Sequence, residues 1–134
     1  MELPKVAEKH VVTCIVRNKG RILLLQRSNK VGSYRGQWAG VSGYVERGEE
    51  EEAAARRELE EEIGRGKASL AKRIEPQRFR DGEVVWCVHA FLFDVKDRSV
   101  RIDWEHQSLE WVVPEDVAKY RTVPGLREIV CKLL

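Results

Sequence analysis

Residues 43–64, GYVERGEEEEAAARRELEEEIG, join a glycine-bearing loop to a glutamate-rich segment. We predict a helix over residues 49–63, because Ala55, Leu59 and Ile63 recur at every fourth position and would form one buried stripe. The four glutamates that open this segment put negative charge at the positive end of the helix dipole. Glycines just past it are typical of a helix C-terminus.

Three glutamates of this helix share one face. Glu58, Glu61 and Glu62 stand at i, i+3 and i+4, while Leu59 turns away toward the core. Like charges at this spacing repel by a few tenths of a kcal/mol per pair. A hard cation such as Mg²⁺ reverses that effect, because it takes oxygen ligands and shares them with substrate phosphates. The alternative, a solvated acidic face, applies best to the run Glu49–Glu52 taken alone.

The spacing of the segment resembles the Nudix box of the MutT-like hydrolase family. The matching positions are Gly43, five residues, Glu49, seven residues, Arg57-Glu58-Leu59, one residue, Glu61-Glu62, one residue and Gly64. Apart from the aliphatic position filled by Leu59, the pattern has seven fixed residue types, which would recur at these offsets by chance at roughly 10⁻⁷ to 10⁻⁶ per start position.

The chain departs from the family pattern in two places. Arg65 stands where the box usually ends on an aliphatic residue, and Gly40-Val41-Ser42 stands where many relatives have Pro-Gly-Gly. The run WAGVSGYVE is also similar to archaeal Nudix domains that accompany initiation-factor-2B-like proteins. The departures put the helix exit and the loop backbone in doubt, while the three helix glutamates match the pattern.

The rest of the chain has the element order of that family. We expect a hairpin of His10–Val16 and Arg21–Gln26 that turns at Gly20, followed by a loop over 28–37. Further elements expected from apolar runs and turn residues are strands over Trp38–Val45, up to Arg80, Val84–Val95 and Leu109–Val113, and short helices from Pro114 and Pro124. The predicted fold is α/β (α+β), a single Nudix-type α/β/α sandwich with a mixed sheet over residues 1–134.

The resemblance implies roles for individual residues. It implies metal ligands at Glu58, Glu61, Glu62 and the Ser42 carbonyl, and it makes Glu61 and Glu62 catalytic. Glu49 and Arg57 match the pair that holds the box loop against the helix. A further catalytic carboxylate from a later loop is expected at Glu105, and the alternatives are Asp103 and Glu110.

Substrate contacts are less well defined by the sequence. Arg27 and Arg35 are candidates for binding phosphate, although each could be a solvated charge. An aromatic platform for a base could come from Tyr34, Trp38, Phe79, Trp86 or Trp104, most of which we expect to be core. His10, His89 and His106 have no mutual spacing that suggests zinc, so core or surface histidines are favoured.

Composition sets broad limits. The chain has 134 residues, a net charge of +2 and three cysteines without a C-x-x-C pair. These features fit one domain in a reducing compartment, and the N-terminus lacks the apolar stretch of a signal peptide, so we expect a cytoplasmic protein. The charge argues neither for nor against a nucleic-acid partner. The resemblance implies a small nucleotide substrate, with no nucleic acid polymer and no membrane, and leaves a homodimer open.

The expected activity is hydrolysis of a diphosphate bond in a nucleoside diphosphate linked to another group, with Mg²⁺ or Mn²⁺ as cofactor. Candidate substrates are dNTPs, ADP-ribose, nucleotide sugars and dinucleoside polyphosphates. Two alternatives stay open: a Nudix-like sensor that binds without cleaving, and an isopentenyl-diphosphate isomerase on the same scaffold, which would need a catalytic cysteine.

Overall fold

The centre of the molecule is a mixed sheet of eight strands. The computed structural model describes residues 7–134. Neighbouring strands follow the order β3-β2-β1-β7-β5, while β4 pairs with β1, β6 with β7, and β8 with β2. The elements in chain order are β1 (Ala7–Asn18), β2 (Arg21–Arg27), β3 (Trp38–Ala39), β4 (Val41–Tyr44), α1 (Glu51–Ile63), β5 (Ala68–Arg73), β6 (Gln77–Asp81), β7 (Val84–Val95), β8 (His106–Val112), the 3₁₀ helix η1 (Pro114–Lys119) and α2 (Leu126–Leu133).

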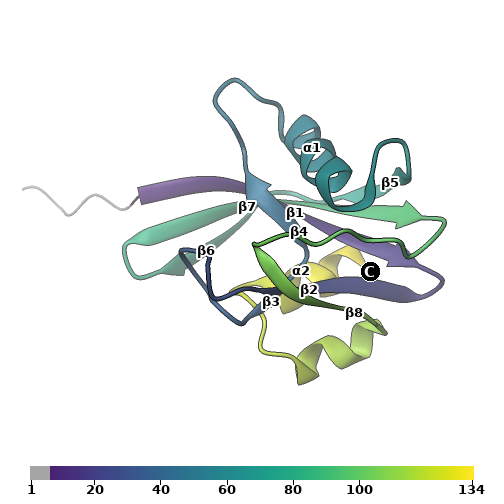
Figure 1. The fold of residues 1–134 in the computed structure, drawn as a ribbon. Coiled ribbons are helices and arrows are strands. Elements are labelled where there is room, and N and C mark those ends of the chain that lie inside the picture. Colours follow the sequence, from purple (N-terminus) through teal and green to yellow (C-terminus); the bar gives the residue numbers. More distant parts are fainter. Residues whose placement is uncertain (1–6) are drawn as a thin grey trace, which may run out of the picture.

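Helices cover the two faces of the sheet (Figure 1). Successive strand residues point to opposite faces, so β1 sends Val12 and Cys14 toward α1 and sends Ile15 toward α2. Leu59 and Ile63 bury the apolar stripe of α1 on the first face. The predicted α/β/α arrangement with a mixed sheet is confirmed. Across residues 7–134 no helix is both long and apolar enough to span a membrane.

Strand β1 organises the sheet. It turns into β2 through Lys19 and Gly20, both with positive φ (48° and 78°), which confirms the predicted hairpin. Along most of its length β1 then pairs in parallel with β7, and residues 11–14 pair antiparallel with β4. The loop before α1 and the long strand β7 are therefore held on either side of β1.

Several boundaries differ from the sequence-based expectations. The helix starts at Glu51 and not at residue 49, because Glu49 stays in the loop, where its carboxylate accepts a hydrogen bond from the Glu46 amide. The expected strand Trp38–Val45 is two short strands interrupted at Gly40. A Cβ at Gly40 would lie 2.7 Å from the Cys14 carbonyl oxygen, so the backbones approach too closely there for a side chain.

The remaining elements differ in length and type. The stretch up to Arg80 forms two strands, β5 and β6, each paired antiparallel with β7. Strand β8 begins at His106 and not at Leu109. The segment from Pro114 is a 3₁₀ helix with proline in its first turn. The last helix starts at Leu126, two residues after Pro124, because Gly125 takes a left-handed conformation at the N-cap.

Candidate active site

The three candidate ligands on helix α1 are buried to different degrees. Glu62 is buried with 7% of its surface exposed, Glu58 is partly buried, and 56% of the Glu61 side chain is exposed. Since Leu59 and Ile63 anchor the helix in the core, the carboxylate face cannot rotate away. The helix therefore holds a row of carboxylates that runs from the interior toward solvent.

The deepest of these carboxylates lacks a hydrogen-bond partner. Among the described residues, Glu62 Oε2 and His106 Nδ1 are buried atoms without one, and Glu62 Oε1 lies 3.7 Å from His106 Nδ1. Asp103 completes a group with Glu62 and His106 whose ligand atoms lie within 4.8 Å of one another. A buried carboxylate without a partner is costly, so this arrangement requires a cation or a proton.

Electrostatics at the site agree with that requirement. Burial, followed by repulsion from Asp103 and Glu105, raises the pKa of Glu62 from 4.5 to about 7. Burial, followed by repulsion from Glu61, raises the pKa of Glu58 to about 7 as well. Burial also raises the pKa of Glu105 and lowers that of His106, which favours a neutral imidazole. Carboxylates from α1 and from the loop before β8 thus repel one another across one space.

This repulsion predicts an unusual pH dependence of stability. The Glu58 and Glu62 carboxyls titrate near 4.5 when unfolded and near 7 when folded, so the folded state binds more protons in between. The free energy of unfolding of the metal-free protein should therefore fall as pH rises through this window. The change for Glu62, from 4.5 to about 7, corresponds to at most about 3 kcal/mol. Urea unfolding in EDTA at several pH values measures the loss, and a rise in stability across the window would contradict it.

Arg57 connects the box loop to the helix. Its Nε and Nη2 donate to both Glu49 carboxylate oxygens at 2.9 and 3.0 Å, and Nη2 also donates to the Tyr44 carbonyl oxygen at 3.0 Å. Nη1 donates to Glu58 Oε1 at 2.8 Å. Hydrogen bonds from Arg57 and from the Glu46 amide lower the pKa of Glu49 to about 2. One planar guanidinium therefore positions both the loop and a candidate ligand.

Replacing Arg57 by lysine should lower kcat/KM about tenfold or more, because the charge is kept while the planar fork is lost. A single ammonium cannot donate in parallel to Glu49 and also hold Glu58. Steady-state kinetics with the preferred substrate measure the change. Arg56→Lys is the matched control, since Arg56 is exposed, forms its ion pair with Glu52 and otherwise lies over the Phe93 ring, away from the box loop. Unchanged activity in Arg57→Lys would contradict the assigned role.

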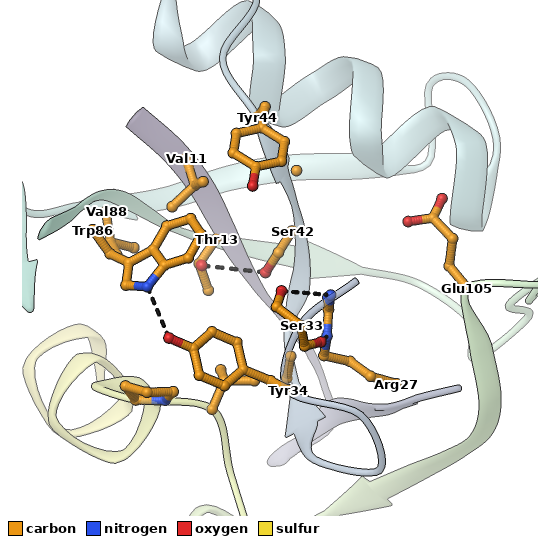
Figure 2. A pocket seen from close by; sticks show the side chains of 14 residues that line it. Val11, Thr13, Arg27, Ser33, Tyr34, Ser42, Tyr44, Trp86, Val88 and Glu105 are labelled. Carbon is orange, nitrogen blue, oxygen red and sulfur yellow. Dashed lines mark hydrogen bonds between the residues drawn. The ribbon is translucent and has the colours of Figure 1, made fainter. Parts of the chain in front are cut away.

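A cavity of about 180 Å³ opens beside the Glu105 carboxylate (Figure 2). Residues from β1, β2, β4, β7 and the 28–37 loop line it, and Glu105 lies at its rim. Ser42, expected to offer a carbonyl, is in β4 and lines the cavity, with its hydroxyl 3.2 Å from that of Thr13. In the described chain none of the three α1 glutamates lines the cavity itself. Glu105 and Gly43 do, and Gly43 lies against the Glu58 carboxylate, while aromatic side chains form another part of the wall.

The structure separates the two candidate phosphate-binding arginines. Arg27 lines the cavity, half-buried, and donates from Nε to the Ser33 carbonyl oxygen at 2.9 Å. Burial lowers its pKa and the charge of Glu105 opposes that effect, so the two groups face the same space. Arg35 is exposed, donates to the Val31 carbonyl oxygen and does not line the cavity.

The aromatic candidates also fall into two groups, those that line the cavity and those that pack in the core. Tyr34 and Trp86 line the cavity; Trp86 Nε1 donates to the Tyr34 hydroxyl at 2.9 Å, and that hydroxyl donates to Asp81 at 2.5 Å. These bonds hold Tyr34 at φ 50°, a conformation that non-glycine residues seldom take. Trp104 is 59% exposed and lines the outer part of the same opening. Trp38 and Phe79 instead pack against the core on the α2 face.

Sequence reasoning missed two features of the site and left a third open. Tyr44 is 54% exposed and lines the cavity, although it lies inside the box loop itself. His106 sits beside Glu62 because β8 pairs with β2, a long-range contact without a local signal. Asp103, an alternative to Glu105, belongs to the Glu62 cluster, whereas Glu110 is exposed on β8 outside the cavity.

Known proteins share this fold along nearly the whole chain. Residues 8–133 match the model of the NUDIX domain. The nucleoside triphosphatase NudI of Escherichia coli is 33% identical over 126 residues, which cover 84% of this chain and 87% of that protein. A MutT protein from Methanosarcina mazei Go1 matches at 25% identity with a TM-score of 0.78, covering 97% of this chain and 95% of that one.

A third match concerns the fold alone. The E. coli dihydroneopterin triphosphate pyrophosphohydrolase has a TM-score of 0.77 at 20% identity, with 94% of this chain and 96% of that chain covered. The family model and the relative at one-third identity go further than a fold likeness, because both extend over the segment that carries the carboxylates. The chain belongs to the NUDIX family and is a Nudix hydrolase.

Proposed function

We propose that this protein hydrolyses a diphosphate bond in a nucleoside triphosphate or another nucleoside diphosphate derivative, with Mg²⁺ or Mn²⁺ as cofactor. The observation that carries the proposal is that Glu105 and Arg27 line one cavity with aromatic walls, while Glu105 also lies close enough to Glu58 and Glu62 of α1 to repel them. The relative NudI, a nucleoside triphosphatase by name, favours a triphosphate as the substrate to test first.

The carboxylate set fits a hard divalent cation. All candidate donors are oxygens, and the buried Glu62 Oε2 has no other partner among the described residues. Glu58, Glu61 and Glu62 would hold the ion, together with the Ser42 carbonyl expected from the family pattern. When bound, the cation offsets charge on phosphate oxygens and acidifies water.

The protein's own residues orient the reactants. Glu105 is the proposed base, and its raised pKa makes the carboxylate a better proton acceptor for an attacking water near neutral pH. Glu61 and Glu62 add negative charge that keeps the site selective for cation-bound phosphate. Arg27 contacts a phosphate oxygen of the substrate from the opposite wall. Catalysis is then a matter of position and charge, without a covalent intermediate.

Aromatic side chains are the proposed contacts for the base. Tyr44, Tyr34 and Trp86 gather on one side of the cavity, with Tyr44 and Trp86 ring centroids 6.2 Å apart. Trp104 extends the opening on the side of Glu105. A planar base stacked here would leave its phosphates pointing toward Arg27 and the carboxylates.

The two alternatives fit the site less well. An isomerase of this scaffold would need a cysteine at the reaction centre, and in the described part of the chain no cysteine lines the cavity. A sensor would bind without cleaving, which the complete set of box glutamates disfavours.

A substrate panel tests the proposal. Nucleoside triphosphates, ADP-ribose, a nucleotide sugar and a dinucleoside polyphosphate are incubated with Mg²⁺ or Mn²⁺, and products are separated by anion-exchange chromatography. We expect hydrolysis of at least one compound, dependence on the cation, and strong loss in Glu61→Gln. Binding of a panel member without turnover would replace the hydrolase proposal with the sensor.

A further inference from the structure

A second cluster of metal-ligating side chains lies away from the carboxylates. His10 of β1 stands opposite Cys87 of the parallel neighbour β7, and His89 follows two residues along β7 on the same face. Ligand atoms of the three residues lie within 4.8 Å of one another. Their side chains point to the α1 face, whereas Val11 and Val88, their neighbours in sequence, line the 180 Å³ cavity on the other face.

The donor distances suit tetrahedral coordination. His10 Nδ1 lies 3.2 Å from His89 Nε2, and that nitrogen lies 3.9 Å from Cys87 Sγ. Bonds of about 2.0–2.1 Å to nitrogen and about 2.3 Å to sulfur in a tetrahedron put ligand atoms roughly 3.3–3.6 Å apart. Small side-chain rotations would bring the observed distances to these values.

The surroundings support binding of a cation. Cys87 and His89 are buried, while His10 is exposed and leaves an entry path from solvent. Glu8 Oε1 lies 3.9 Å from His10 Nε2, the ring nitrogen that faces away from His89, where a carboxylate orients a metal-binding histidine.

Charged groups around the cluster are mixed in sign. Glu51 at the start of α1 and Glu8 are negative, while Arg73 and Arg78 from β5 and β6 are positive and pair with those two glutamates. The positive and negative charges of these ion pairs therefore largely cancel, so they do not strongly repel a divalent ion. Nitrogen and sulfur donors select Zn²⁺ over Mg²⁺, so the two metal chemistries are separated by ligand type.

We propose that His10, Cys87 and His89 form a binding site for a zinc-class transition-metal ion on the α1 face of the sheet, with water as the fourth ligand. The bound ion joins the first half of β1 to β7. Because Val11 and Thr13 of the same strand form the cavity wall, the ion stabilises the sheet behind the nucleotide site and takes no part in hydrolysis. Without metal, the 3.2 Å contact is a hydrogen bond between the two imidazoles.

Cobalt titration of the full chain tests the site. Co²⁺ is added to metal-free, reduced protein in excess Mg²⁺, which occupies the carboxylates, and the thiolate-to-Co²⁺ charge-transfer band is recorded. We expect the band to saturate at one equivalent and to disappear when Zn²⁺ is added. Cys131→Ser, which removes the exposed cysteine of α2, should leave the titration unchanged. Cys87→Ser should abolish the band, and His89→Gln should weaken Co²⁺ binding at least tenfold.

His10→Gln decides the result if the buried substitutions disturb folding. The side chain is exposed, so its replacement should leave the fold intact by circular dichroism while weakening Co²⁺ binding at least tenfold. Zn²⁺ should also raise the melting temperature of the wild type and not that of His10→Gln. Absence of the band in the wild type, its persistence in Cys87→Ser, or equal affinity in His10→Gln would overturn the proposal.

Discussion

Replacing Glu62 with glutamine is expected to lower kcat/KM by on the order of 10³-fold, equivalent to about 4 kcal/mol of transition-state stabilisation. The substitution keeps shape and volume but removes the charge from the deepest carboxylate of the site. Its Oε2 has no partner in the described chain, so the negative charge is free to serve a cation. Steady-state kinetics over a range of Mg²⁺ concentrations should show two changes. The Mg²⁺ concentration for half-maximal activity should rise, and kcat should fall.

A stability measurement separates this effect from misfolding. Since ionised Glu62 is buried and repelled by Asp103 and Glu105, Glu62→Gln should be at least as stable as the wild type in EDTA above pH about 7. Glu60→Gln is the matched control, because Glu60 is exposed on the same helix and does not belong to the group of Glu62, Asp103 and His106. Wild-type kinetics in Glu62→Gln, or an equal loss in Glu60→Gln, would refute the assignment.

The parts of the site that were predictable from sequence lie on one helix. The 3.6-residue period alone puts Glu58, Glu61 and Glu62 on one face, and the family pattern adds roles to that geometry. Their burial was not predictable, because it depends on the loop before β8. Arg101 N donates to the Glu62 carbonyl oxygen at 2.7 Å and ties that loop to the end of α1.

Residues brought together by strand pairing were harder to predict. His106 reaches Glu62 only because β8 pairs with β2. The histidine cluster depends on parallel pairing of β1 with β7, in which His10 meets Cys87. Spacing along the chain suggested no zinc site, since a shift of one residue in either strand would turn these side chains to the opposite face. Register is set by the whole sheet and is not encoded in a local pattern.

The box pattern has a glycine at position 43, but the sequence does not show why a glycine is needed there. A Cβ built on Gly43 would lie 2.1 to 2.8 Å from the Glu58 carboxylate atoms. The glycine therefore makes room for a candidate ligand, which Arg57 holds against the loop from the other side. Backbone freedom is not the requirement here, since φ at Gly43 is outside the left-handed region.

Gly43→Ala should consequently lower kcat/KM about 100-fold, because Glu58 must leave its position and the Arg57 bond that holds it. The metal concentration for half-maximal activity should rise, since one ligand is displaced and not removed. Gly32→Ala is the matched control: an added Cβ there meets no atom within 4 Å and its φ is not left-handed.

The double variant Gly43→Ala with Glu58→Gln provides the sharper test. If Gly43 acts through Glu58, the two losses in kcat/KM will not multiply, whereas fully multiplicative losses would mean that the methyl group acts on the loop by another route.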